Sequence, residues 1–422
     1  MTIFEGRVKE WDMADLRPEF AENGALGVYV SVPFCRAKCS FCNFASGVGT
    51  PVAIERYVES LCAEIGSVGK RAESLGAMLP RKADTVYFGG GTPSLLEPAQ
   101  LNRILAAIRG QFDVAADAEI TMEAAPGQIS DELLKAALRL GVNRVSLGVQ
   151  SFIDREAASV GRSHTGESCV AEIARLRRAG VGKVAADLIA GLPHQTDASW
   201  QRSLDAAVAS ELDHLSVYLF EVDEGSRLGA EVLGGGARFY APEVPNEERA
   251  SAMYERACAF LPEHGFGQYE ISNFARAGFQ AKHNRKYWER APYVGFGLDA
   301  HSMLKIEGPG LGAQGPECAV RFANADELAR YDGREPAEIT RVDARGAFEE
   351  ALFLGLRLVE GVSVAALRQR FDAGWVDEAA GIARELAAGG LMVVDGERWA
   401  LTSHGRLVSN DVFGRLLESV AV

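Results

Sequence analysis

Short β-rich runs alternate with amphipathic helical stretches six times in the first 235 residues, and this alternation constrains the fold more than any other feature. Repeated strand–helix–strand units pack with right-handed crossovers, so their strands become parallel neighbours in one sheet. Six units are too few for a closed eight-stranded barrel, so we predict an α/β fold, a partial (three-quarter) (β/α)6 barrel. The β-rich runs lie at residues 26–33, 84–89, 119–124, 142–148, 184–191 and 214–222.

The pattern changes after about residue 235. Residues 247–264 are typical of a helix, and a Gly/Pro-rich segment follows at 305–316. Further helical periodicity then leads to two short strand-like pieces within 391–402, which suggests a winged-helix-like domain without the dense Lys/Arg face of a DNA binder. We therefore expect an N-terminal arm (1–24), an α/β core (25–235), a linking segment (236–340) and a smaller C-terminal helical, winged-helix-like domain (341–422).

The net charge and the number of cysteines exclude several classes of protein. Asp plus Glu number 58 against 44 Lys plus Arg, and the net charge of −14 argues against general nucleic-acid binding. No apolar run approaches the roughly 18 residues of a membrane span, although peripheral membrane contact stays open. The N-terminus lacks the apolar centre of a signal peptide, and seven cysteines, an odd number, form no disulfide framework. We expect a cytoplasmic protein.

Three cysteines cluster directly after the first predicted strand, in the order Cys35-x3-Cys39-x2-Cys42. A loop with this spacing can wrap a [4Fe–4S] cluster, giving one thiolate to each of three irons and leaving the fourth iron open to a small molecule. A structural zinc site is an alternative, but no second Cys or His pair lies nearby. A redox dithiol would need only Cys39 and Cys42 and would leave Cys35 without a role.

Glycines and single polar residues follow the other predicted strands. Residues 89–94, Gly-Gly-Gly-Thr-Pro-Ser, end the second strand and match neither a P-loop nor the dinucleotide-binding fingerprint. Because the carboxyl ends of parallel strands meet at one rim, we expect the polar residues there to form a pocket for a ribose and an amino-acid moiety. Those residues are Glu123, Gln150, Arg162 and Asp187.

Together these motifs resemble the radical S-adenosylmethionine (SAM) superfamily, and within it the oxygen-independent coproporphyrinogen oxidase family. The resemblance covers residues 25–415 and keeps the family's motif order. It implies that Cys35, Cys39 and Cys42 hold a [4Fe–4S] cluster and that the α/β core is a radical SAM core. It also implies eight SAM contacts: Tyr29, Gly90, Gly91, Thr92, Glu123, Gln150, Arg162 and Asp187.

Two further features point to one branch of this family. Coproporphyrinogen dehydrogenases carry an extra cysteine two residues beyond the third ligand, where this chain has Phe44. The hexad 283–288, His-Asn-Arg-Lys-Tyr-Trp, is similar to the HNxxYW signature of the heme-chaperone branch, the HemW type. That likeness makes His283 a candidate heme ligand, while a buried His bonded to a carbonyl is the alternative. Ala125 departs from the family's usual Asn before Pro-Gly.

The resemblance implies a heme chaperone that binds heme as cargo and transfers it to acceptor hemoproteins. Its scaffold would carry a [4Fe–4S] cluster and SAM. A radical SAM enzyme that oxidises or methylates a tetrapyrrole is the alternative, since the same residues would hold the cofactor. A third interpretation is a zinc-stabilised adaptor that acts through the C-terminal domain. The remaining histidines, including His301, are assigned no role.

Overall fold

The computed structural model describes residues 24–306 and 318–418. The expected N-terminal arm, 1–24, lies outside the described residues except for Gly24. The main sheet contains six parallel strands that pair in chain order: β1 (Leu26–Val32), β2 (Lys82–Gly90), β3 (Asp113–Ala124), β4 (Arg144–Gln150), β5 (Lys183–Ala190) and β6 (His214–Leu219). β1 pairs with β9 and β6 pairs with β8, so the six strands do not close into a barrel. The prediction of a partial (β/α)6 barrel is confirmed.

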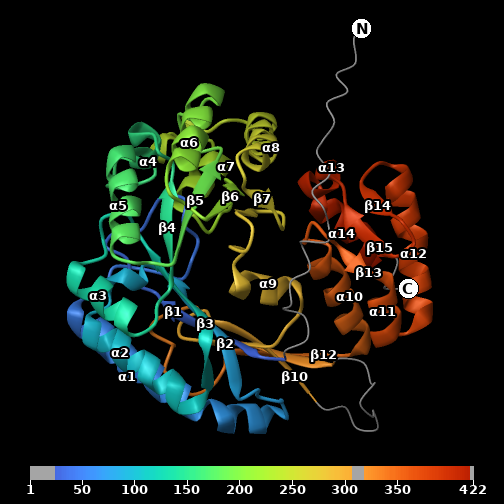
Figure 1. Cartoon of the computed structure of the whole chain (residues 1–422), viewed down its shortest axis with the longest axis horizontal. Coiled ribbons are helices and arrows are strands. Elements are labelled where there is room, and N and C mark those ends of the chain that lie inside the picture. The colour runs from blue at the N-terminus through green and yellow to red at the C-terminus, as the bar shows by residue number, and fades with distance from the viewer. Residues whose placement is uncertain (1–23, 307–317, 419–422) are drawn as a thin grey trace.

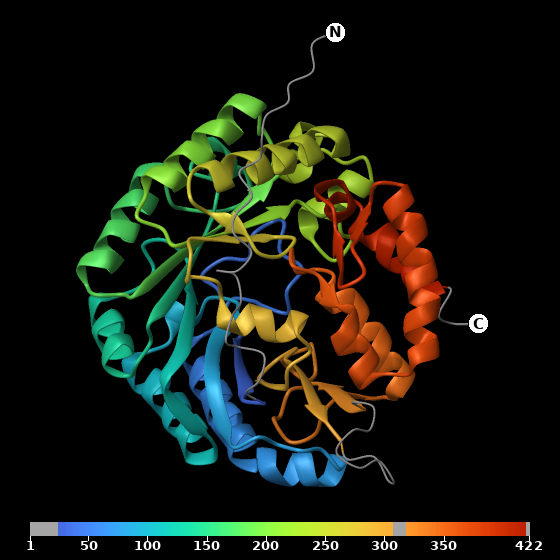
Figure 2. The ribbon, with the colours of Figure 1, turned by 45° about the vertical axis from the view of Figure 1, so that its right-hand side comes forward.

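Helices connect these strands and cover the outer face of the curved sheet (Figures 1 and 2). They are α1 (Pro51–Leu75), α2 (Pro98–Gln111), α3 (Asp131–Arg139), α4 (Asp154–Ser159), α5 (Gly166–Arg178) and α6 (Asp197–Ala209), with a short 3₁₀ turn η2 at Pro93–Leu95. The sequence explains α3 well. The Ser130 hydroxyl caps it by accepting a hydrogen bond from the Leu133 N–H, and Gly141 follows its end with φ of +95°.

The segment 236–340, expected to link two domains, extends the main sheet at both edges. It is preceded by α7 (Arg227–Leu233), and η3 (Arg238–Glu243) and α8 (Glu247–Glu263) open it. β8 (Asn273–Ala275) and β7 (Gly267–Gln268) continue the sheet beyond β6. β9 (Tyr293–Phe296), β10 (His301–Lys305), β11 (Ala319–Ala323) and β12 (Glu338–Val342) continue it beyond β1. Helix α9 (Lys282–Trp288) lies between the sheet and the C-terminal helices (Figure 2).

The C-terminal part consists of helices around a small three-stranded antiparallel sheet, ordered β13-β15-β14. Its elements are α10 (Ala344–Gly355), β13 (Val362–Ser363), α11 (Val364–Arg370), α12 (Ala373–Ala388), β14 (Met392–Val394), β15 (Arg398–Leu401), α13 (Ser403–Leu407) and α14 (Ser409–Glu418). Its hydrophobic core also takes in Tyr293, Met303 and Ala319 from the main sheet. The two parts therefore share buried apolar surface, which stabilises their contact.

Candidate functional site

The three clustered cysteines line a cavity of about 660 Å³ at the carboxyl ends of the parallel strands. Cys39 is buried, and Cys35 and Cys42 are partly buried. The Thr92 hydroxyl lies 3.5 Å from the Cys35 sulfur and Nη1 of Arg162 lies 3.6 Å from the Cys39 sulfur. Both groups can donate hydrogen bonds to sulfur, as the surroundings of cluster-bound cysteines do.

The glycine turn after β2 packs directly against the cysteine loop. The Gly91 N–H donates to the Val32 carbonyl at 2.9 Å, and the Thr92 N–H donates to the Phe34 carbonyl at 2.7 Å. A Cβ atom at Gly91 would lie 2.7 Å from the Phe34 carbonyl oxygen and 2.8 Å from the Val32 carbonyl oxygen. Gly90 has φ of +97°, a conformation that glycine adopts without strain. Only glycine fits position 91, because the two backbones approach too closely for any side chain.

Polar side chains from four strands and loops converge on the same cavity. Seven of the eight residues expected to contact SAM line it together with the cysteines: Gly90, Gly91, Thr92, Glu123, Gln150, Arg162 and Asp187. The eighth, Tyr29, lines an adjoining cavity instead. The convergence follows from the parallel sheet, which brings the ends of β2 to β5 to one rim.

Burial sets the charge of the acidic groups in this cavity. Desolvation raises the pKa of Glu123 to about 7, although its carboxylate accepts a hydrogen bond from the Tyr87 hydroxyl at 2.7 Å. Desolvation also raises the pKa of Asp187, which lies 3.5 Å from the Ser146 hydroxyl. A cationic or hydroxyl-bearing ligand would satisfy both carboxyl groups, because it supplies the hydrogen bonds and charge that burial removes.

Gln150 and Arg162 complete the rim on the β4 side. Gln150 has φ of +65°, an uncommon conformation for a residue with a side chain, and such strain concentrates at functional sites. Arg162 donates to the Gly148 carbonyl and reaches Cys39 through its other terminal nitrogen. The Arg162 guanidinium therefore joins the cysteine loop to the end of β4.

A second cavity of about 300 Å³ adjoins the first, and the two share Phe44, Gly90 and Glu123. Aromatic and apolar side chains make up much of its lining, which comprises Tyr29, Ser31, Phe44, Ala45, Gly90, Glu123, Tyr287, Tyr293, Leu298, Asp299 and His301. The side chain of Phe44 is 60% exposed at the junction of the two cavities. Sequence reasoning did not anticipate this second cavity, because β9 and the turn after it reach the site only through the sheet extension.

His283 lies in the core rather than in either cavity. It is 1% exposed, and its two ring nitrogens lie 2.8 Å from the Thr85 hydroxyl and 2.9 Å from the Tyr287 hydroxyl. Burial lowers the pKa of its imidazole to about 3, with a further contribution from the Lys286 cation. Ligation of heme by His283 would require one ring nitrogen to give up its hydroxyl partner and become accessible from the core, so that role stays a prediction.

The other hexad side chains make structural contacts. The Lys286 ammonium bonds the Ala25 carbonyl at 2.8 Å and lies 2.7 Å from an Asp84 carboxylate oxygen. Trp288 lies under the guanidinium of Arg357, 4.3 Å from its ring centre. The hexad thus ties the residue before β1 and the first part of β2 to the C-terminal part.

The three cysteine sulfurs and the cavity that they line fit a [4Fe–4S] cluster with SAM. In residues 24–306 and 318–418, no group of three or more His, Cys, Asp or Glu side chains is placed to hold a single metal ion. Cys62, Cys169 and Cys258 line neither cavity and pack in or against the hydrophobic core, as their helical spacing predicts.

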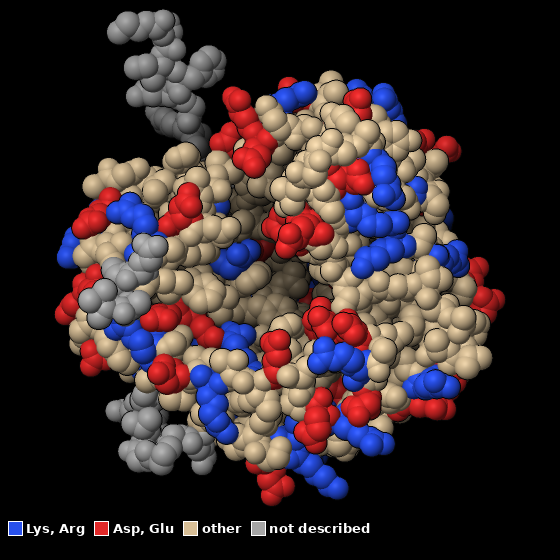
Figure 3. Space-filling view, turned by 180° about the vertical axis from the view of Figure 1, so that it is seen from behind, with Lys and Arg blue, Asp and Glu red and all other residues tan. Residues whose placement is uncertain are grey.

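Figure 3 shows acidic and basic side chains interspersed around a hollow in the face seen from behind. Within the described chain, no helix is long and apolar enough to cross a bilayer.

Comparison with known proteins gives the same assignment as the motifs. Residues 29–207 match the Radical SAM superfamily, and residues 342–408 match the HemN C-terminal domain. The chain is 32% identical to the heme chaperone HemW of Lactococcus lactis subsp. lactis over 92% of this chain and 96% of that protein. It is 31% identical to the heme chaperone HemW of Bacillus subtilis over 92% of this chain and 98% of that protein.

A solved structure shares the fold. Coproporphyrinogen III oxidase (HemN) from Escherichia coli, described as a radical SAM enzyme, superposes with a TM-score of 0.76. The match covers 93% of this chain and 90% of that chain at 24% identity, so it shows the architecture alone. The relatives that are more than 30% identical over nine-tenths of the chain decide the branch. The chain belongs to the radical SAM superfamily and, within it, to the HemW branch.

Proposed function

We propose that this protein is a heme chaperone, which binds heme and transfers it to acceptor hemoproteins from a radical SAM scaffold. The observation that carries the proposal is the pair of adjoining cavities, one lined by three cysteines and the other by aromatic side chains beside an exposed Phe44. An accessible apolar site suits a cargo that must leave again. The HemW relatives support the proposal by their names and their coverage of the chain.

Within this proposal, Cys35, Cys39 and Cys42 hold the [4Fe–4S] cluster. When bound, the cluster and SAM together supply one-electron reductive cleavage chemistry. Glu123 and Asp187 would accept hydrogen bonds from the cationic or hydroxyl groups of SAM, and the glycine turn lets the cysteine loop approach the end of β2 closely. Gln150, Arg162 and Thr92 would complete the set of residues that hold SAM in this cavity, and Tyr29 lines the second cavity beside it.

Oxidation or methylation of a tetrapyrrole is not proposed. The extra cysteine of the coproporphyrinogen dehydrogenases is replaced by Phe44, and the likeness to HemN bears on fold alone. We further propose that the transfer takes place in the cytoplasm, as the cysteine use of the sequence predicts.

Anaerobic reconstitution with iron and sulfide, followed by heme titration of the same sample, tests the proposal. We expect about four irons and four sulfides per chain and a heme absorption spectrum that saturates with added heme. Cys39→Ala should lose most of the iron, because one of three thiolates is removed. Cys62→Ala is the matched control, since Cys62 lines neither cavity. Equal iron in the two variants, or no saturable heme binding by the native chain, would contradict the proposal.

A further inference from the structure

We propose that His301, at the start of β10, is the residue that ligates the heme iron, and that heme docks over the opening of the second cavity. The inference rests on the proposed function and names the residue at which the cargo is held. His301 lines the second cavity with its side chain 65% exposed. An exposed imidazole on the wall of an aromatic cavity offers an open coordination position to an iron porphyrin.

The other histidines are placed less well for this role. His283 is buried with both ring nitrogens bonded to hydroxyl groups. His164 is the histidine that lines the cysteine cavity, and there its Nε2 is bonded to the Val149 carbonyl at 2.9 Å. His214 is buried against the Tyr269 hydroxyl. His301 alone among the described histidines lines the second cavity.

The turn that carries His301 contains two residues with a left-handed backbone. Gly297 has φ of +96° and Asp299 has φ of +55°, which is uncommon for a residue with a side chain. A Cβ at Gly297 would lie 2.3 Å from the Tyr57 hydroxyl, so no larger residue fits there. The close approach of Tyr57 and the left-handed residues together give this turn one defined conformation.

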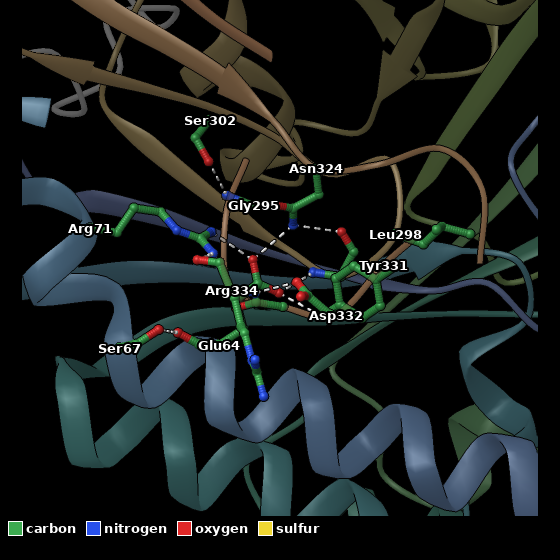
Figure 4. A network of polar contacts seen from close by, with 12 residues as sticks. Glu64, Ser67, Arg71, Gly295, Leu298, Ser302, Asn324, Tyr331, Asp332 and Arg334 are labelled. Carbon is green, nitrogen blue, oxygen red and sulfur yellow. Dashed lines mark hydrogen bonds and ion pairs between the residues drawn. The ribbon is translucent and has the colours of Figure 1, made fainter. Parts of the chain in front are cut away.

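A buried polar network holds this turn in place (Figure 4). The Glu64 carboxylate, from α1, accepts the Gly297 N–H at 2.9 Å, and the Tyr57 hydroxyl accepts the Leu298 N–H at 2.9 Å. Asn324 donates to the Gly297 carbonyl at 2.7 Å and to Glu64 at 2.8 Å. The network fixes the turn before any ligand binds, and a preformed position reduces the entropy lost on binding.

Asp299 gives His301 a carboxylate neighbour. Its Oδ1 lies 3.8 Å from Nε2 of His301, and both side chains are partly exposed. Among the described residues, neither ring nitrogen of His301 has a hydrogen-bond partner within bonding distance. Once one ring nitrogen binds iron, the other donates its proton to an acceptor, and a carboxylate in that position strengthens the ligand.

The size and lining of the second cavity fit a cargo that remains accessible. At about 300 Å³ the cavity lies at the small end of ligand pockets, so a porphyrin would rest partly outside it. Tyr287 and Tyr293 line its wall, and Phe44 stands exposed where it meets the cysteine cavity. Aromatic rings pack on the porphyrin plane while the iron meets His301.

Heme titration of His301→Ala tests the inference, with His264→Ala as the matched control because His264 is exposed and lines neither cavity. Absorption and electron paramagnetic resonance spectra report the ligand of the iron directly. We expect His301→Ala to lose the histidine-ligated spectrum and at least tenfold in heme affinity, and free imidazole to restore the spectrum. His264→Ala should match the native chain, and circular dichroism should show all variants folded.

The outcomes separate this inference from the proposed function. If the native chain does not bind heme, the proposed function fails and this inference fails with it. If the native chain binds heme and His301→Ala keeps the same spectrum and affinity, His301 is not the ligand, while the chaperone function stands. Loss of the spectrum in a folded His283→Ala variant, with His301→Ala unchanged, would assign the iron to the hexad and overturn the inference.

Discussion

Replacement of Glu64 by alanine should strongly destabilise the fold. The Glu64 side chain is 0% exposed and accepts four hydrogen bonds, from Arg71 and Asn324 at 2.8 Å each, Tyr331 at 2.6 Å and the Gly297 N–H at 2.9 Å. Arg71 is only 5% exposed, so Glu64→Ala leaves a buried cation without its counter-charge. Removal of one partner from a buried ion pair costs about 3–5 kcal/mol of unfolding free energy.

Urea unfolding followed by far-ultraviolet circular dichroism measures this loss. With a slope of about 3 kcal/mol per molar urea, the midpoint should fall by roughly 1–1.7 M. Glu55→Ala is the matched control, because Glu55 lies on the same helix and also pairs with an arginine, Arg103, but both side chains are more than 40% exposed. Its midpoint should stay close to that of the native chain. Similar midpoints for the two variants would refute the reasoning that burial makes the Glu64 pair important.

Two further outcomes follow from the cysteine cavity. Gly91→Ala should lower the iron and sulfide bound after reconstitution several-fold, because its Cβ would clash with the backbone of the cysteine loop. Gly110→Ala is the control and should bind as much as the native chain, because its Cβ meets nothing within 4 Å. Equal iron and sulfide in the two variants would contradict the close approach at Gly91. The pKa of Glu123 is about 7 in the folded chain, above the ordinary value of 4.5. The stability that the neutral Glu123 carboxyl contributes is therefore fully present below about pH 4.5 and is lost as the pH rises through about 7. Glu123→Gln should therefore raise the melting temperature relative to the native chain at pH 8 and not at pH 4, and a constant difference would show that Glu123 does not titrate as described.

Local sequence patterns predict the six βα units because the hydrophobic periodicity of each strand and helix lies within its own residues. The runs at 84–89 and 184–191 became β2 and β5 with bounds shifted by at most two residues. The strands of 236–340 escaped prediction because they are two to five residues long, and because β8 and β9, which join them to the barrel, pair with the distant strands β6 and β1. Such short strands acquire their stability from the sheet they join rather than from their own composition.

The residues of the candidate site likewise divide into those that local sequence could predict and those that depend on distant contacts. The cysteines and the polar strand ends could be predicted to converge, because parallel strands end at one rim. The setting of His283 could not be predicted, because its partner Thr85 comes from β2, far away in the sequence, and the hexad itself gives no sign of burial. The one local signal near His301 is the sequence Gly-Leu-Asp at 297–299, because glycine and Asp both tolerate a left-handed backbone.

Buried ion pairs join α9 and the turn after it to the C-terminal part of the chain. Arg285 of α9 pairs with Glu360 at 2.6 Å, and Arg290 pairs with Glu350 at 2.7 Å, with both arginines at least 95% buried. A chimera that lacked either glutamate would leave a buried guanidinium group without its counter-charge, which is strongly destabilising. A substitution at either end of a pair would therefore need a compensating substitution at the other, which couples the sequence around α9 to that of the C-terminal part.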